Sequence, residues 1–316
     1  MARRKMRYLP LLILLISFFS QRIDAQELYF RLSGGYAWEA GKTEFNDADP
    51  NEITRIRQST DVTLNADGTV TIEALNGTLG EGYKAMATVG YMFAPYFGVE
   101  LTGTYFHGRE TLIGRFQSPS AQSEAVAFLR GFDVMPAIIL TPGLDGINPY
   151  TRFGLILSAG GDLTVETAVD QANGIGPNAD LRIRAETEVQ PRFSIGYSAV
   201  AGVTFPITET LRVFGELQYN NFSLEGEEAE IKEFTSLAVS DDETNLLPGR
   251  QLEDLPVSEK KFIFKDQFTQ SATQEPPADE PRVLPTRYLN ASNVGINIGL
   301  RIGLNPKGSA SVKPGY

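Results

Sequence analysis

Apolar side chains alternate with small or polar ones along several segments of more than ten residues. The clearest example is the segment 193–205, whose two faces can be separated by position. One face carries Phe193, Ile195, Tyr197, Ala199, Ala201, Val203 and Phe205, and the other carries Ser194, Gly196, Ser198, Val200, Gly202 and Thr204. A period of two predicts a β-strand with one apolar face. The mean strand of a soluble domain is only about 5–6 residues long, whereas a strand that crosses a membrane beside a polar interior needs this length and pattern.

Eight such segments predict eight strands. They cover residues 28–38, 82–93, 96–107, 124–140, 150–160, 193–205, 211–222 and 292–304. Short turns alternate strictly with long connections, and the long ones are Glu39–Glu81, Gly108–Ser123, Gly161–Gln190 and Ser223–Ala291. Bacterial outer-membrane barrels alternate short periplasmic turns with long external loops. The sequence therefore predicts an all-β, eight-stranded, antiparallel up-and-down transmembrane β-barrel with long extracellular loops and periplasmic termini.

Two local features modify this picture. Asp67-Gly68 lies between two short alternating runs in the first long connection, which predicts a hairpin and a sheet that extends beyond the membrane. In the fourth strand, Arg130 shares the outward register of Phe132. Either a bulge near Gly131 redirects Arg130, or its side chain snorkels to the headgroups. Pro136 also removes one hydrogen-bond donor from that strand.

The two ends of the chain differ from the strands. Basic residues precede an apolar run over 9–19, and Ile23-Asp24-Ala25 follows as a plausible cleavage site that ends in a small residue. This order predicts a secretory signal peptide over 1–25, because the apolar run is shorter than the about 20 residues that a spanning helix needs. A membrane anchor is the alternative. The predicted domains are then the barrel at 26–304 and a short periplasmic tail at 305–316.

Charge and cysteine content exclude several classes of protein. The 316-residue chain has no Cys and a net charge of −11. Without residues 1–25 it has 23 basic and 38 acidic residues, so no basic surface is expected for nucleic acid. The acidic residues concentrate in the last long connection, where 225–282 holds fifteen of them against six basic residues. The absence of Cys excludes disulfides and a lipid-modified cysteine.

The inward register of the predicted strands collects charges of both signs. These residues are Arg31, Lys84, Glu100, Asp133, Arg152, Glu216 and Arg301. The interior of an eight-stranded barrel is just wide enough for side chains to fill it. Because a lone buried charge is costly, the mixture of signs favours an ion-pair network that closes the interior. The alternative is a charged lining for a narrow solute path.

Aromatic residues cluster near the predicted strand ends. The candidates are Tyr36, Trp38, Phe93, Tyr96, Tyr105, Tyr150, Phe205 and Tyr219. Such clusters predict the two aromatic girdles that flank the apolar band of a membrane barrel. The alternative is that these rings belong to the core of a soluble sandwich.

Candidate chemistry is sparse. The chain has one His and no Cys, which excludes a cysteine nucleophile and a site with several histidines. His107 lies at the outer end of the third strand with no Ser beside it, so a structural role is favoured over a catalytic one. Acidic runs at 47–52 and 241–243 could bind Ca²⁺ but lack the spacing of an EF-hand loop, and solvated loop residues are expected instead. We expect no enzyme activity, no cofactor and no metal.

Four segments carry a family resemblance. They are 82–105 (GYKAMATVGYMFAPYFGVELTGTY), 147–161 (INPYTRFGLILSAGG), 198–219 and 293–304. The chain resembles the outer membrane protein β-barrel domain family, the small barrels of the OmpA, OmpX and OmpW type. The resemblance implies a Gram-negative outer-membrane location, contact with lipid and lipopolysaccharide, and insertion by the barrel assembly machinery. The chain differs from the family pattern at its C-terminus. Members of the family usually end with an aromatic residue at the tip of the last strand, whereas here residues 305–316 follow that strand.

These patterns specify architecture more than activity. We expect a structural or surface-interaction role, in which the long acidic loops are presented outside the cell to a protein or glycan. The alternative is a narrow channel or conduit for small or hydrophobic solutes.

Overall fold

The computed structural model describes residues 27–45, 59–240, 243–269, 277–286 and 288–304. The predicted signal peptide, the tail at 305–316, the acidic run at 47–52 and residues 241–242 lie outside the described residues. No helix in the described ranges has the length and apolar character needed to cross a membrane.

Eight strands pair antiparallel in a closed ring, which confirms the all-β class and the eight predicted segments. In ring order they are β1 (Glu27–Glu39), β6 (Gly82–Ala94), β7 (Phe97–Gly108), β9 (Ala121–Leu140), β10 (Asn148–Gly176), β12 (Ile195–Pro206), β13 (Leu211–Asn221) and β19 (Asn293–Gly303). The ring closes because β19 pairs with β13 on one side and with β1 on the other. Apart from the far end of β10, every strand end lies within three residues of its predicted position.

The outer face of the ring is apolar. The alternation of the strands places large apolar side chains outside, where Leu101, Phe153, Leu217 and Ile298 are all more than half exposed. The intervening residues point inward and are buried, as Thr102 and Gln218 are. A soluble protein buries its apolar face, so this ring has the opposite polarity.

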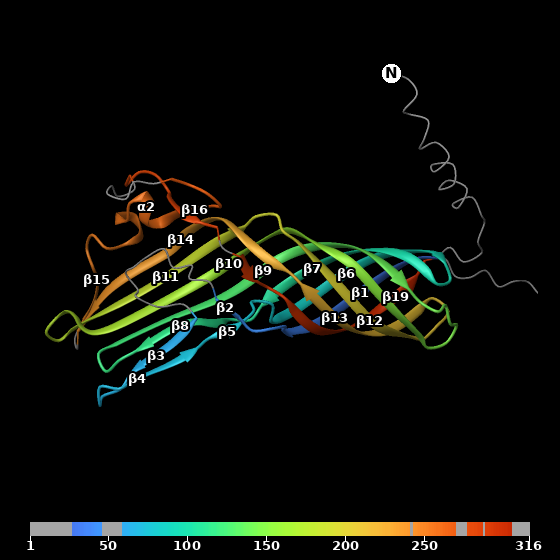
Figure 1. The fold of residues 1–316 in the computed structure, drawn as a ribbon, viewed down its shortest axis with the longest axis horizontal. Coiled ribbons are helices and arrows are strands. Elements are labelled where there is room, and N and C mark those ends of the chain that lie inside the picture. The colour runs from blue at the N-terminus through green and yellow to red at the C-terminus, as the bar shows by residue number, and fades with distance from the viewer. Residues whose placement is uncertain (1–26, 46–58, 241–242, 270–276, 287, 305–316) are drawn as a thin grey trace, which may run out of the picture.

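The sheet continues well beyond one end of the ring (Figure 1). Here β10 runs on to pair with β11 (Ala179–Pro191), β9 pairs with β8 (Thr111–Gln117), and β11 pairs with β14 (Ser223–Val239). The expectation of long loops is therefore wrong for these segments, which are mostly strands. Their inner face is held by an apolar core that includes Leu163, Val189 and Phe262.

The remaining elements complete this extension. They are β2 (Thr43–Glu44), β3 (Thr60–Leu64), β4 (Val70–Ala74), β5 (Asn76–Gly77), β15 (Thr244–Leu246), η1 (Leu252–Asp254), α2 (Val257–Lys260), β16 (Lys261–Lys265), β17 (Arg282–Pro285) and β18 (Tyr288–Asn290). Strands β3 and β4 form the hairpin predicted at Asp67-Gly68, and Gly68 has the positive φ of 83° that such a turn requires.

The wall of the ring is irregular where β10 leaves it. The register between β9 and β10 shifts between Ser158 and Gly160, so the bulge lies on β10 and not near Gly131 on β9. Arg130 keeps its outward register and is exposed, with its guanidinium carbon 4.7 Å from the centroid of the Phe128 ring. The pairing of β10 with β12 ends at Leu157, and its pairing with β11 begins at Leu163. Between Leu157 and Leu163, β10 therefore lacks register partners on the side of β11 and β12, while its pairing with β9 continues.

Candidate functional site

Four buried charged side chains form a closed cycle of ion pairs inside the ring, here called the ion-pair cycle. Glu100 lies 3.0 Å from Arg31 and 2.8 Å from Arg152, measured from carboxylate oxygen to guanidinium nitrogen. Glu216 lies 2.6 Å from Arg152 and also pairs with Arg31. All four side chains are at most 3% exposed. Two positive and two negative charges make the cycle neutral.

The four strands that supply the ion-pair cycle alternate around the ring. Arg31 is on β1, Glu100 on β7, Arg152 on β10 and Glu216 on β13, and one other strand separates each from the next. In a closed barrel of eight tilted strands, the side chains of one interior layer come from alternate strands. The cycle is therefore one complete layer, and its four long side chains occupy the cross-section of the ring.

Two tyrosines complete this layer. The Tyr29 hydroxyl donates to Glu100 at 2.6 Å, and the Tyr150 hydroxyl donates to Glu216 at 2.6 Å and accepts from Arg31 at 2.7 Å. The assignment of Tyr150 to an aromatic girdle is wrong, because this side chain is only 5% exposed. Its position two residues before Arg152 gives both the same inward register. Tyr29 likewise precedes Arg31 by two residues and shares its inward register. Sequence reasoning missed Tyr29, although this spacing would have identified it as an interior residue.

Aromatic faces also contact the guanidinium groups. The Arg31 guanidinium carbon lies 3.8 Å from the centroid of Phe214, a fully buried ring that sequence reasoning also missed. Arg301 lies 3.8 Å over Tyr29 and pairs with Glu27 at 3.0 Å, so it is adjacent to the ion-pair cycle but not part of it. Cation–π contacts of this kind gain strength when they are desolvated.

Lys84 and Asp133 lie outside the ion-pair cycle. The Lys84 ammonium donates to Asn293 at 2.9 Å and to Gln218 at 3.3 Å. Gln218 in turn accepts from Asn297 at 3.0 Å, so these residues form a second, amide-rich layer. Asp133 forms no ion pair within the described part of the chain.

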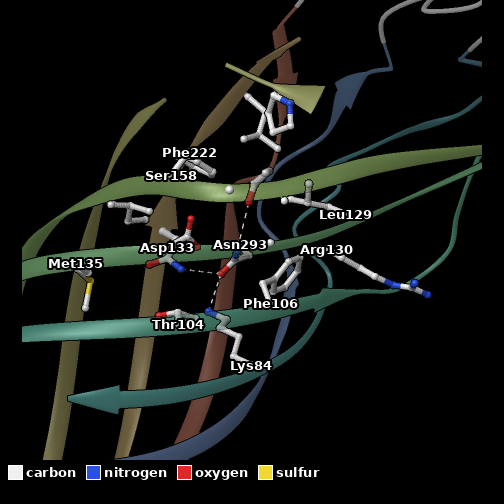
Figure 2. A pocket seen from close by; sticks show the side chains of 18 of the residues that line it. Lys84, Thr104, Phe106, Leu129, Arg130, Asp133, Met135, Ser158, Phe222 and Asn293 are labelled. Carbon is white, nitrogen blue, oxygen red and sulfur yellow. Dashed lines mark hydrogen bonds between the residues drawn. The ribbon is translucent and has the colours of Figure 1, made fainter. Parts of the chain in front are cut away.

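Lys84 and Asp133 face one small cavity of about 50 Å³ (Figure 2). Thr104 and Ser158 line it beside them, and Phe106, Leu129 and Phe222 form its apolar side. Figure 2 shows that Arg130 points away from the other labelled residues. The space has room for a few waters and is far below the roughly 300 Å³ of a pocket for a drug-sized ligand.

The other girdle candidates lie on the outer face. At one end of the ring, Tyr36 contacts Trp38 and Tyr83 edge-to-face, with centroids 5.3 and 5.0 Å apart. At the other end, Phe93 stacks on Phe97 with centroids 5.9 Å apart, and Tyr96 is exposed. Tyr105 contacts Phe132, and Phe205 and Tyr219 are exposed. The rings thus gather near both ends of the apolar outer face.

At the end of the ring where Tyr36 contacts Trp38 and Tyr83, Glu81 and Arg109 form polar contacts with the Tyr36 hydroxyl or with each other. The Tyr36 hydroxyl donates to Glu81 at 2.6 Å, and Arg109 donates to the same carboxylate oxygen at 2.9 Å. The hydrogen bond from Tyr36, followed by that from Arg109, lowers the pKa of the Glu81 carboxyl below its usual range. An ionised Glu81 paired with Arg109 is therefore held at this rim.

His107 is exposed on the outer face of β7. Its neighbours across the ladder are Tyr83 on β6 and Arg130 on β9. Neither of these two ladder neighbours is a serine or an acid. No group of three metal-ligating side chains occurs among the residues described.

No protein-family model matches the sequence, and no curated protein is significantly similar to it. Among solved structures, Neisserial surface protein A (NspA) aligns over 87% of this chain and 96% of its own, with 11% identity and a TM-score of 0.36. OccAB2 of Acinetobacter baumannii aligns over 90% and 99%, with 9% identity and a TM-score of 0.11. Both likenesses are too weak to bear on function, which has to be inferred from the residues of this chain.

Proposed function

We propose that this protein is a bacterial outer-membrane β-barrel with a closed interior and a structural or surface-interaction role. The observation that carries the proposal is the polarity of the closed ring. Its outer face is apolar and its interior holds a neutral cycle of buried charges. This arrangement suits lipid outside and side chains or water inside.

The dimensions of the ring support the same conclusion. Strand β19 has 11 residues and β6 has 13. At about 3.3 Å per residue and a tilt of about 40°, eleven residues rise roughly 28 Å, close to the apolar band of about 25 Å in such barrels. The extended sheet lies at the end with the long connections, which in this class is the cell exterior.

The ion-pair cycle supports a barrel that does not conduct. We expect purified protein to migrate in a heat-modifiable manner on gels and to show no stable conductance steps in a planar lipid bilayer. Large, reproducible steps from folded protein would contradict a closed interior. Fractionation of cells that express the full chain tests the location independently.

A narrow conduit for small or hydrophobic solutes is the second candidate. The cavity beside Lys84 and Asp133 favours it, because this cavity reaches Gly160 and Gly161 where the ladder of β10 is interrupted. Liposome-swelling assays with small sugars and with alkyl alcohols separate the two candidates. Swelling above that of empty liposomes would favour the conduit.

The outer face of the extended sheet is where a partner would bind. Glu166, Glu186 and Glu233 are direct neighbours across three adjacent strands, so a cluster of three carboxyl groups lies on this face. We propose an extracellular protein, a glycan or lipopolysaccharide bridged by divalent cations as its partner, and the barrel assembly machinery as the route of insertion. Nucleic acid is not expected to bind. If cells that express wild-type protein and cells that express His107→Gln have the same lipid A, this result fits a non-enzymatic role.

A further inference from the structure

The β3–β4 hairpin projects from the long sheet and is here called the wing (Figure 1). Strand β3 pairs with β8 in parallel and with β4 antiparallel. Strand β4 pairs with β3 alone, so its outer edge has no strand partner within the described part of the chain. All five residues of β4 are exposed. The wing therefore presents a free sheet edge.

The backbone groups at this edge can be assigned from the two ends of the hairpin. The Asn65 N–H donates to the Thr69 carbonyl, and the Leu75 N–H donates to the Ser59 carbonyl, both at 2.8 Å. The odd-numbered residues of β4 thus direct their backbone groups toward β3. Because these groups alternate in an antiparallel pair, Val70, Ile72 and Ala74 direct theirs to the open side.

The edge lacks most of the features that protect natural sheet edges. Such edges carry lysine, proline or a bulge, whereas β4 reads Val-Thr-Ile-Glu-Ala with Glu73 as its single charge. Val70 is 53% exposed and Ile72 is 67% exposed. Leu64, opposite Val70 in the hairpin, is also exposed. An exposed apolar patch on an open edge is typical of an interaction site.

We propose that β4 pairs edge to edge with β4 of a second copy of this chain, antiparallel and centred on Ile72. In this register Ile72 faces its own counterpart, Val70 faces Ala74, and Thr71 faces Glu73. All five residues overlap, the free backbone groups of both edges meet, and no like charges stand opposite each other. The edge is thus complementary to itself, which is the requirement for a two-fold symmetric interface.

The proposed contact between two β4 edges is small, so a single contact is expected to be weak. A five-residue edge buries far less than the roughly 1,200 Å² of a stable interface, so a single pair is weak and transient. Many copies on one surface raise the effective concentration of the second contact and convert weak pairs into durable adhesion. The wing is therefore suited to contacts between surfaces that carry many copies.

The symmetry also sets the direction of the partner. A two-fold axis perpendicular to an antiparallel sheet reverses the strand direction. The wing strands run along the length of the molecule in Figure 1, so the two rings lie at opposite ends of the paired wings. Two copies joined in this way sit in two facing membranes. This last step rests on the outer-membrane location proposed above, whereas the pairing of the edges does not.

Single engineered cysteines test the pairing, because the chain has no Cys of its own. In the proposed register two Ile72 Cα atoms lie about 5.5 Å apart, within the range that a disulfide spans. Mild oxidation of Ile72→Cys in detergent is expected to give a covalent dimer. Two controls are expected to give none: Thr71→Cys, whose counterpart is a diagonal neighbour about 7–8 Å away, and Thr63→Cys on β3.

Each outcome of this experiment is informative. Equal dimer yields from Ile72→Cys and Thr63→Cys, or no dimer from either, overturn the pairing. A higher yield from Thr71→Cys overturns the register. Heat-modifiable migration of each variant shows that the ring has folded, since the wing lies outside it.

Vesicle clustering tests the facing arrangement. Proteoliposomes of wild-type protein are expected to cluster, as measured by light scattering. Ile72→Lys places two like charges together and is expected to abolish clustering, whereas Thr63→Lys is expected to retain it. Inserted protein that forms the Ile72→Cys dimer but does not cluster vesicles overturns the facing arrangement. Protein that fails to insert at all would contradict the proposed outer-membrane function instead.

Discussion

Glu216→Gln tests the energetic role of the ion-pair cycle. The Glu216 carboxylate accepts hydrogen bonds from Arg31, Tyr150 and Arg152. The amide of glutamine replaces one accepting oxygen with a donor that faces guanidinium donors. It also leaves Glu100 as the single carboxylate for two buried arginines. The variant therefore removes one charge from a neutral, desolvated cycle.

The expected loss can be bounded from these contacts. Three hydrogen bonds to a charged group contribute about 1.5–3 kcal/mol each, which sets an upper range of about 4.5–9 kcal/mol. Glu100 continues to pair with both arginines, so the expected loss lies at or below the lower end of this range, about 3–5 kcal/mol, as for other broken buried pairs. Urea unfolding in detergent can be followed by the fluorescence of Trp38, the one tryptophan. With a slope of about 2 kcal/mol/M, the midpoint falls by about 1.5–2.5 M.

Asp170→Asn provides the matched control. Asp170 pairs with Arg182 and Arg184 on the extended sheet, where all three side chains are 44–47% exposed. Exposed pairs contribute at most about 1 kcal/mol. A Glu216→Gln variant no less stable than Asp170→Asn would refute the energetic role of the cycle. Adding Arg152→Met to Glu216→Gln restores neutrality and is expected to cost less than the two single changes together.

Three further predictions concern other parts of the chain. Tyr150→Phe removes a donor to Glu216 and is expected to cost about 1–3 kcal/mol in the same urea assay, whereas Tyr96→Phe on the outer face is expected to leave stability unchanged. Gly161 and Gly160 both have positive φ, 137° and 144°, but a Cβ on Gly161 would lie 2.3 Å from the Arg130 carbonyl oxygen while Gly160 has open space. Gly161→Ala is therefore expected to lower the thermal midpoint more than Gly160→Ala, and equal losses would contradict the described packing. Burial, together with Glu233 and Glu166, raises the pKa of the Glu186 carboxyl. A carboxyl group whose pKa is raised in the folded state stabilises the fold at pH values below its unfolded-state pKa. This contribution is lost as the pH rises through the folded-state pKa. Hydrogen-exchange protection of β11 is thus expected to fall between acidic and neutral pH, and less so in Glu186→Gln.

The ring could be predicted from the sequence because one physical rule acts along all eight strands. Residues such as Ile195 and Tyr197 alternate with Gly196 and Ser198, and this period places each side chain inside or outside. The same rule assigns Arg31, Glu100, Arg152 and Glu216 to the interior. Tyr150 lies beside a turn, where a girdle ring is expected, but its register with Arg152 places it in the interior.

Other features depend on contacts that a single strand does not encode. The ion-pair cycle joins residues from alternate strands, so it depends on the tilt and stagger of the closed sheet. The extended strands were expected to be loops because segments such as Thr164–Asp170 present no continuous apolar face. Their inner residues, Val165 and Val189 among them, are covered by a core that includes Phe262, more than seventy residues away in sequence.

In the proposed outer-membrane location, the apolar outer face of the ring is expected to contact lipid along its whole height. Spin labels at single cysteines on β12 test it most directly in reconstituted bilayers, at Ile195, Tyr197, Ala199, Ala201 and Val203. All five positions have an outward register. We expect collision with dissolved oxygen to exceed collision with a water-soluble nickel chelate at each position, with the largest difference at Ala199. Preferential collision with the nickel chelate at Ala199 would contradict a membrane-spanning ring.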